Sequence, residues 1–185
     1  FGREIKFSYD AQSRIVEVLP PGAVSGTGAG SASSPIRYAY AEAASLGAGV
    51  PAQSQLTSVT WQDGTLRRYH YEDARFAQAL SGITDEAGVR YASYTYDALG
   101  RVLRNEHIGG VDRVDFAYGF NAAGQATTTL TDYTGAGGAA TSRSYAFDNQ
   151  HGVLRPTAVS APCTQCGNTQ LASSYNSAGD LIKAI

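Results

Sequence analysis

The sequence contains no methionine, only two cysteines and little charge of either sign. Charged residues make up 16% of the chain and the formal net charge is −2, so no excess of positive charge is present to attract nucleic acid or an anionic membrane surface. Hydrophobic runs are short as well, and none approaches the roughly 18 residues that a membrane-spanning helix requires. We therefore expect neither a nucleic-acid partner nor a membrane span.

The N-terminal residues, FGREIKFSYD, include no start methionine and no charged-then-apolar secretory leader. This predicts a piece of a longer polypeptide, without a targeting signal of its own. Hydrophobic residues form 43% of the 185, which is too many for a disordered chain and enough for one domain with a sizeable core.

The chain is rich in glycine and tyrosine, with 21 and 12 residues respectively. Aromatic residues favour strands, and glycines favour the turns between them. The stretch Tyr94–Val102, YTYDALGRV, combines the two, because it places an aromatic pair before an acid and then a glycine. The composition therefore predicts short strands joined by tight turns.

The same pattern recurs along the whole chain. The second aromatic residue of each copy falls at Tyr9, Tyr40, Tyr71, Tyr96, Phe120, Phe147 and Tyr175. The acid or amide that follows is clearest at Asp10, Asp97, Asn121, Asp148 and Asn176, and the glycine at Gly100, Gly124, Gly152 and Gly179. Seven copies spaced 24 to 31 residues apart predict a repeat array over residues 1–185.

The chemistry of one copy explains the order of its residues. The Asp97 carboxylate can accept hydrogen bonds from backbone N–H groups further along the turn. Gly100 can adopt the left-handed conformation that completes a short hairpin. Tyr94 and Tyr96 are two residues apart, so they project from one face of a strand.

Each repeat also holds a second turn signal, for example Asp63-Gly64 or Asp85 to Gly88. Two turns in about 25 residues leave two strands per repeat. The fold class predicted is all-β, with repetitive antiparallel hairpins forming one continuous twisted sheet. A sandwich with regularly spaced turns is the alternative.

A long surface loop at about 20–35 and a second insertion at about 41–55 interrupt the array, and AEAASLG in the latter predicts one helical turn.

The motif YTYDALGRV resembles the YD repeat of RHS (rearrangement hotspot) proteins, and Tyr69–Val102 resembles an RHS-repeat segment nearly throughout. The departures are Ser13 and Arg75 at the glycine position and Ser173 at the first aromatic position, where we expect different turns.

The resemblance implies a non-enzymatic segment of a hollow β-shell that encloses a toxic C-terminal polypeptide, as in polymorphic toxins and toxin complexes. It also implies a secreted or cell-surface bacterial protein. The partners would be the remainder of the parent chain and the enclosed toxin domain. Because a cut sheet has unpaired edge strands, we also expect self-association through those edges.

The remaining motifs indicate little chemistry. Cys163 and Cys166 form a lone CxxC pair, for which a loop staple or free thiols are favoured over a weak zinc site and a redox pair. Only three histidines are present to complete a zinc site, and none is at a paired spacing. We expect no cofactor, no catalytic residue and no defined binding residue.

The alternative function is a surface recognition or adhesion module that binds carbohydrate or a partner protein through its tyrosines. It predicts exposed tyrosines, whereas a wall segment predicts buried ones. An enzyme is a third hypothesis, behind both.

Overall fold

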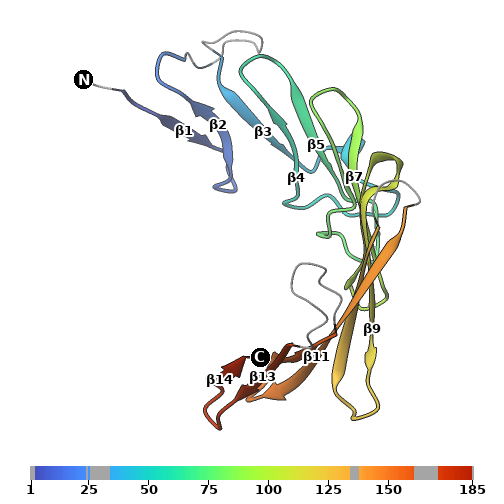
Figure 1. Ribbon diagram of the computed structural model, residues 1–185. Coiled ribbons are helices and arrows are strands. Elements are labelled where there is room, and N and C mark those ends of the chain that lie inside the picture. Colours follow the sequence, from blue (N-terminus) through green and yellow to red (C-terminus); the bar gives the residue numbers. More distant parts are fainter. Residues whose placement is uncertain (1–2, 24, 26–33, 134–137, 161–170, 185) are drawn as a thin grey trace. The chain divides into compact units, whose positions relative to one another are not determined.

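The computed structural model describes residues 3–23, 25, 34–133, 138–160 and 171–184 (Figure 1). Fourteen β-strands and two short 3-10 helices make up its regular structure. The strands lie in one sheet in chain order, and the pairings between neighbouring strands are antiparallel. The prediction of an all-β fold with a continuous antiparallel sheet is confirmed. Within the described ranges, no helix has the length and apolar character needed to cross a membrane.

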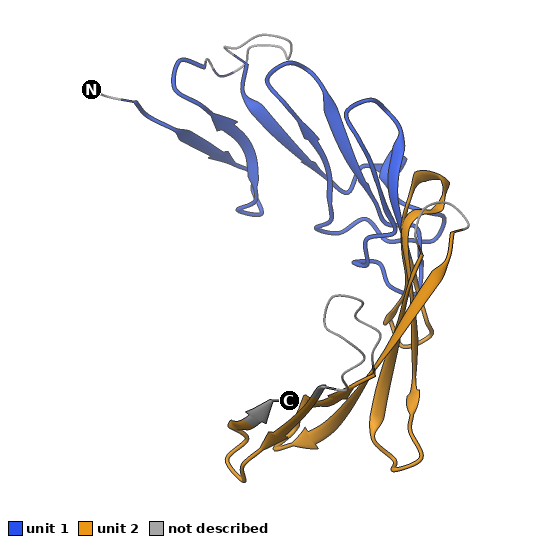
Figure 2. Cartoon of the chain, viewed as in Figure 1, with its two compact units in different colours: residues 1–94 blue, residues 95–185 orange. Residues whose placement is uncertain are grey.

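Contacts divide the chain into two compact units, residues 1–94 and 95–185 (Figure 2). Unit 1 contains β1 (Lys6–Tyr9), β2 (Ile15–Leu19), β3 (Ile36–Tyr40), η1 (Ala43–Ser45), β4 (Leu56–Thr60), β5 (Leu66–His70), β6 (Gly82–Thr84) and most of β7 (Arg90–Tyr96). Unit 2 contains β8 (Val102–His107), η2 (Ile108–Gly110), β9 (Val111–Phe120), β10 (Ala126–Tyr133), β11 (Ala140–Gln150), β12 (Val153–Val159), β13 (Leu171–Tyr175) and β14 (Leu181–Ala184).

The insertion at 41–55 folds back on the sheet of unit 1. It forms the expected single helical turn, η1, and then runs beside the end of β5, where the Gly47 N–H donates to the Tyr71 carbonyl at 2.8 Å. A Cβ on Gly47 would lie 2.6 Å from the Glu72 carbonyl oxygen, so only glycine permits this approach. Val50 in this insertion and Val59 in β4 are two of the few buried apolar residues in the described ranges.

The end of the expected surface loop at 20–35 is also part of this unit's interior. Ser34 has no exposed surface and Pro35 has under 2%. The Ser34 carbonyl accepts a hydrogen bond from the Gln62 side chain at 2.9 Å. The expectation of a surface loop is therefore wrong at the C-terminal end of this segment, because the small residues Ser34 and Pro35 are enclosed where the chain joins β3. Residues 24 and 26–33 lie outside the described ranges.

Unit 2 is built from longer strands and has two chemically different faces. By register, Phe120 of β9, Ala126 of β10 and Phe147 of β11 lie side by side on one face. The opposite face carries hydroxyl side chains, with Thr129 and Ser144 in hydrogen-bond contact at 2.7 Å. Apart from Gly179, no residue in the described part of this unit is buried, and many strand residues are only partly buried, so the ladders of backbone hydrogen bonds contribute much of its cohesion.

Candidate functional site

The turn after Tyr96 has the geometry expected from its sequence. The Asp97 Oδ1 atom accepts hydrogen bonds from the backbone N–H groups of Leu99 and Arg101 at 2.8 and 2.9 Å. Gly100 has φ +77°, which is the left-handed conformation, and its N–H donates to the Asp97 carbonyl. A short acidic side chain and a glycine three residues later thus close the turn locally.

This turn is repeated in three further copies. Asp10, Asn121 and Asn176 each accept from the N–H groups two and four residues on, at 2.8 to 3.0 Å. Gly124 and Gly179 have positive φ, as Gly100 does. The same hydrogen bonds form in the second-turn position at Asp85, followed by Gly88.

The turns at Ser13 and at Arg75, the two residues that replace the glycine of the motif, differ from each other. Ser13, at the glycine position of the first copy, has φ +61° and completes the same turn, so the expectation of a different turn there is wrong. Asp10 holds that turn through the N–H groups of Gln12 and Arg14, which compensates for the less favourable residue. Near Arg75 the turn does differ, because it is capped from Asp73.

Asp148 does not cap a turn, contrary to the expectation for its copy. It lies within β11, opposite Arg155, and its carboxylate accepts from Gln125 Nε2 at 2.8 Å. Asp148 and Gly152 are four residues apart, whereas Asp97 and Gly100 are three apart, and the turn of this copy forms at His151 and Gly152, which both have positive φ. The Asn149 side chain accepts from the Gly152 N–H and so takes over the capping role.

A second set of contacts joins each of two turns to the next repeat. Arg101 Nε donates to Asp97 Oδ2 at 2.7 Å, and the guanidinium carbon lies 4.1 Å from the centre of the Tyr118 ring. The Tyr118 hydroxyl donates to the carbonyl of Val102, the residue after that arginine, at 2.8 Å. We call this arrangement of turn acid, arginine and tyrosine the turn clamp.

The first copy forms the same turn clamp. Arg14 Nε donates to Asp10 Oδ2 at 2.7 Å and stacks over Tyr40 at 4.3 Å. The Tyr40 hydroxyl donates to the carbonyl of Ile15, again the residue after the arginine, at 2.8 Å. Each turn clamp therefore ties a turn to a strand of the following repeat through a cation–π contact and a hydrogen bond.

Two other copies keep only part of the turn clamp. Arg155 stacks over Tyr175 at 5.4 Å, and the Tyr175 hydroxyl donates to the Pro156 carbonyl. In unit 1, the Tyr71 hydroxyl donates to the Leu56 carbonyl at 3.1 Å, and Gln55 occupies the position before that carbonyl. The hydrogen bond from a tyrosine hydroxyl to a backbone carbonyl thus occurs in more copies than the stacked arginine does.

The electrostatics of the turn clamp favour its charged form. The pKa of Asp10 is lowered, first by the hydrogen bond from the Arg14 backbone and then by that residue's side chain. For Asp97, burial acts to raise the pKa, but hydrogen bonds from Arg101 and Leu99 outweigh it and the net shift is downward. Burial raises the pKa of Tyr40 and of Tyr118, so both hydroxyls remain protonated donors.

The aromatic residues expected at the turns differ widely in exposure. Tyr94, Tyr96 and Phe147 are partly buried, and so is Tyr175. Tyr9 is 59% exposed and Phe120 79% exposed. The aromatic pair therefore does not form one uniformly buried row in the described residues.

A network of charges on unit 1 was not predicted from the sequence. Glu72 forms a two-pronged ion pair with Arg90 at 2.8 and 3.0 Å and accepts a hydrogen bond from Ser81 at 2.8 Å. The hydrogen bonds from Arg90 are the main cause that lowers the Glu72 pKa to about 2. Nearby, His70 Nε2 contacts Thr84 Oγ1 at 2.7 Å, and burial is the largest cause that lowers the His70 pKa.

The arginines between residues 101 and 113 form ion pairs with acids of unit 2, and the pair between Arg104 and Asp115 joins neighbouring strands β8 and β9. Arg104 and Arg113 both bind Asp115, which lowers the pKa of that carboxyl, with the Arg113 hydrogen bonds as the largest cause. Arg101 binds Asp97 within its own turn rather than a cross-strand acid. The arginine at the fourth position after the acid is visible in the sequence and could have indicated the ion pair within the turn, which is the local part of the turn clamp.

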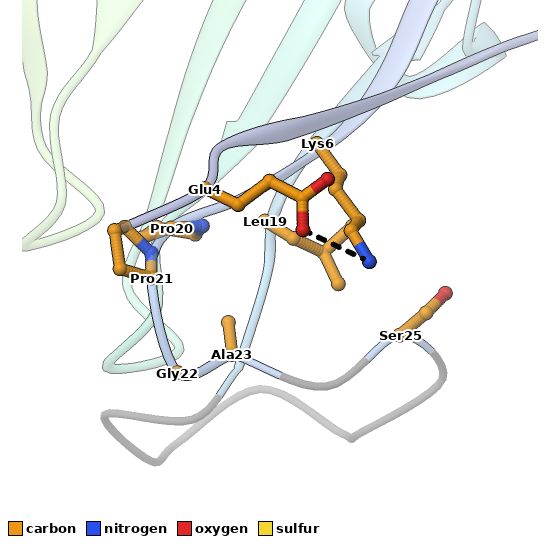
Figure 3. A pocket seen from close by; sticks show the side chains of 8 residues that line it. All are labelled: Glu4, Lys6, Leu19, Pro20, Pro21, Gly22, Ala23 and Ser25. Atoms are coloured by element: carbon orange, nitrogen blue, oxygen red, sulfur yellow. Dashed lines mark ion pairs between the residues drawn. The ribbon is translucent and has the colours of Figure 1, made fainter. Parts of the chain in front are cut away.

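A surface hollow lies beside β1, lined by Glu4, Lys6, Leu19, Pro20, Pro21, Gly22, Ala23 and Ser25 (Figure 3). The figure shows the Glu4 carboxylate directed toward the Lys6 ammonium, 3.4 Å away. Glu4 and Lys6 form an exposed ion pair with each other, so neither charge in the hollow is left to bind a ligand. A second hollow, in unit 2, is lined mainly by apolar residues around Phe120.

The described residues bring together no group of three His, Cys, Asp or Glu side chains suited to hold a metal ion. Cys163 and Cys166 lie outside the described ranges, so the interpretation of that pair as a staple, free thiols or a zinc half-site stays a prediction.

No protein-family model matches this sequence, and a search of curated proteins also finds no match. The features available for a functional proposal are therefore the repeated turn, the turn clamp and the chemistry of the two sheet faces.

Proposed function

We propose that the chain is a non-enzymatic structural segment of an RHS/YD-repeat β-shell that encloses a toxic C-terminal polypeptide. The observation that carries the proposal is the recurrence of one turn in several repeats, joined to the next repeat by the turn clamp. Residues that recur in equivalent positions serve assembly, whereas catalytic groups converge on one place.

The physical task of such a segment is containment. Antiparallel ladders pair the backbone N–H and C=O groups of neighbouring strands, and the outer strands of a sheet are where such groups lack a neighbouring strand. The turn clamp then restrains each turn against the strand of the following repeat. In this proposal the partners are the remainder of the parent chain, which would pair with β1 and β14, and the enclosed polypeptide.

The proposal includes a secreted or cell-surface location in bacteria and self-association of the isolated segment through β1 or β14. Light scattering of the isolated chain tests the second point. We expect species larger than a monomer that grow with concentration, and a monodisperse monomer would contradict it.

Limited proteolysis of the full parent protein tests the containment itself. The polypeptide that follows the repeats should resist a protease under native conditions and become sensitive in mild denaturant. An Asp97→Ala, Arg101→Ala double variant, which removes one turn clamp, should increase the rate of cleavage. Equal cleavage of that polypeptide in native and denatured samples would exclude an enclosing role.

A second function is favoured by one observation, the exposure of several aromatic side chains. Phe7, Tyr9, Tyr91 and Phe120 are between 44% and 79% exposed. Exposed rings supply contact area at low entropic cost, as recognition surfaces require. A surface recognition or adhesion module that binds carbohydrate or a partner protein is therefore the alternative. Protection of Tyr9 and Tyr91 from iodination in the parent protein would count against it.

A further inference from the structure

We propose that the hollow on unit 2 is a binding groove for an extended, uncharged peptide rich in proline and leucine. This inference goes beyond the shell role and does not depend on it. The groove is defined by Leu99, Arg101, Tyr118, Gly119, Phe120, Ala126, Thr127, Thr128, Phe147 and Leu154. Its volume of about 510 Å³ lies within the range typical of ligand sites.

The strand register explains why a groove exists here. Phe120 on β9 and Phe147 on β11 both lie opposite Ala126 on the central strand β10. Two strand spacings separate the two phenylalanines by about 10 Å. Because alanine has a side chain of one carbon, the space between the rings is left open above Ala126.

The next row continues the groove along β10. Tyr118 and Tyr145 lie opposite Thr128 on the two sides. Residues two apart on a strand are separated by about 7 Å, and Tyr118 and Thr128 both line the hollow, so it extends along β9 and β10 for at least that length. An elongated groove with aromatic rings in its lining fits an extended chain better than a compact ligand.

The exposure of the walls indicates a surface that lacks its partner. Leu99 is 75% exposed, Phe120 79% and Leu154 57%, and all three line the same hollow. Contiguous apolar exposure of this kind is typical of interaction sites.

The charge of the lining determines the chemistry of the occupant. Arg101 is the only charged residue in the lining, and its guanidinium is bound to Asp97 and stacked on Tyr118. The Tyr118 hydroxyl donates to a backbone carbonyl. The groove therefore provides no charge to select an acidic or basic ligand.

The same lining disfavours a sugar. A sugar ring carries hydroxyl groups around its edge, and each must replace its hydrogen bonds to water on binding. Besides Tyr118 and Arg101, the only polar side chains in the lining are Thr127 and Thr128. Thr127 belongs by register to the opposite face of β10, with Gly119 and Ala146 as its neighbours.

Proline-rich segments match these properties. They are already extended in polyproline II form, so docking costs little conformational entropy, and they characteristically bind grooves walled by aromatic rings. Their remaining backbone groups stay in water, which suits a groove that is open on one side.

The test uses the purified chain and a fluorescein-labelled peptide of three Pro-Leu-Pro units, followed by fluorescence anisotropy. We expect saturable binding, and Ala126→Leu should weaken it by about tenfold or more because the larger side chain fills the floor of the groove. The matched control is Ala117→Leu, an exposed position on the other face of β9, which should change the affinity by less than about twofold. Circular dichroism verifies that both variants keep the strand content of the parent chain.

Three results would overturn the inference: no saturable binding, equal binding to the Ala126→Leu variant, or equal binding of a peptide in which alanine replaces every proline. Competition by cellohexaose at this groove would assign it to sugar instead. The measurement uses the isolated chain, so its outcome is separate from the proteolysis test of enclosure.

Discussion

The two units share one strand arrangement but achieve cohesion in different ways. In unit 1 the end of the loop at Ser34 and the insertion at 41–55 contact the sheet region, and Ser34, Ser45, Gln55, Thr57 and Val59 are buried. In unit 2 Gly179 is the one buried residue among those described, although the strands reach 10 and 11 residues in β9 and β11. A single-layered sheet thus persists through long ladders where no insertion supplies a local core.

The largest effect that tests this contrast is expected from removal of the buried side-chain amide of Gln55. Its Nε2 atom donates to the carbonyls of Pro51 and Ala77 at 3.0 and 2.9 Å, and its Oε1 atom accepts from the Gln53 N–H. Gln55→Ala removes three hydrogen bonds and leaves a cavity, so the free energy of unfolding should fall by about 3 kcal/mol. Chemical denaturation measures the effect.

The matched variant in unit 2 is Gln125→Ala. Gln125 also forms side-chain hydrogen bonds, to Asn121 and Asp148, but it is only partly buried, so water can replace them. We expect a loss of about 1 kcal/mol. Equal losses at the two glutamines would show that burial does not distinguish the units.

Valine provides a second matched pair. Val59 in β4 is 4% exposed, whereas Val153 in β12 is 54% exposed. Val59→Ala should lower the free energy of unfolding by about 2 kcal/mol through lost packing, and Val153→Ala by less than about 0.5 kcal/mol. Thermal melts followed by circular dichroism compare the two, and a larger effect at Val153 would reverse the contrast.

The turn clamp should be the feature in which the units agree. Tyr40→Phe in unit 1 and Tyr118→Phe in unit 2 each delete one hydroxyl-to-carbonyl hydrogen bond, so each should cost about 1 kcal/mol. Tyr9→Phe, at an exposed ring, is the control and should be neutral. A large difference between Tyr40 and Tyr118 would mean that the turn clamp depends on its unit.

The smallest expected effect is the pH dependence that Glu72 contributes in unit 1. Its pKa is lowered from an ordinary 4.5 to about 2, chiefly by Arg90, so the native state favours the charged form. The stabilisation is present above pH 4.5 and is lost as the pH falls toward 2. Glu72→Gln should flatten the fall in melting temperature across that interval, and an unchanged profile would show that the Arg90 pair contributes little.

The sequence predicts the elements whose cause is local. An acid or amide, two spacers and a glycine define a turn within five residues, so Asp97 and Gly100 could be assigned without any tertiary contact. The strand face of Tyr94 and Tyr96 follows from their spacing in the same way. The all-β class follows from the repetition of these local signals.

Features that depend on distant residues could not be predicted in this way. Ser34 and Gln55 are polar residues in segments with the composition of loops, and they are buried only because the insertions meet the sheet. Asp148 has the sequence of a turn residue, but its position is decided by pairing with β12. The turn clamp was missed because it joins residues 17 to 26 positions apart, such as Arg101 to Tyr118 and Arg14 to Tyr40.

The strict chain order of the strands has a consequence for how such a protein is made and how it evolves. Each strand pairs with the strand that precedes it in the chain, so a hairpin can add its backbone ladder to the growing sheet as it leaves the ribosome. For the same reason, duplication or loss of a hairpin pair in the gene changes the length of the protein but threads no segment through another.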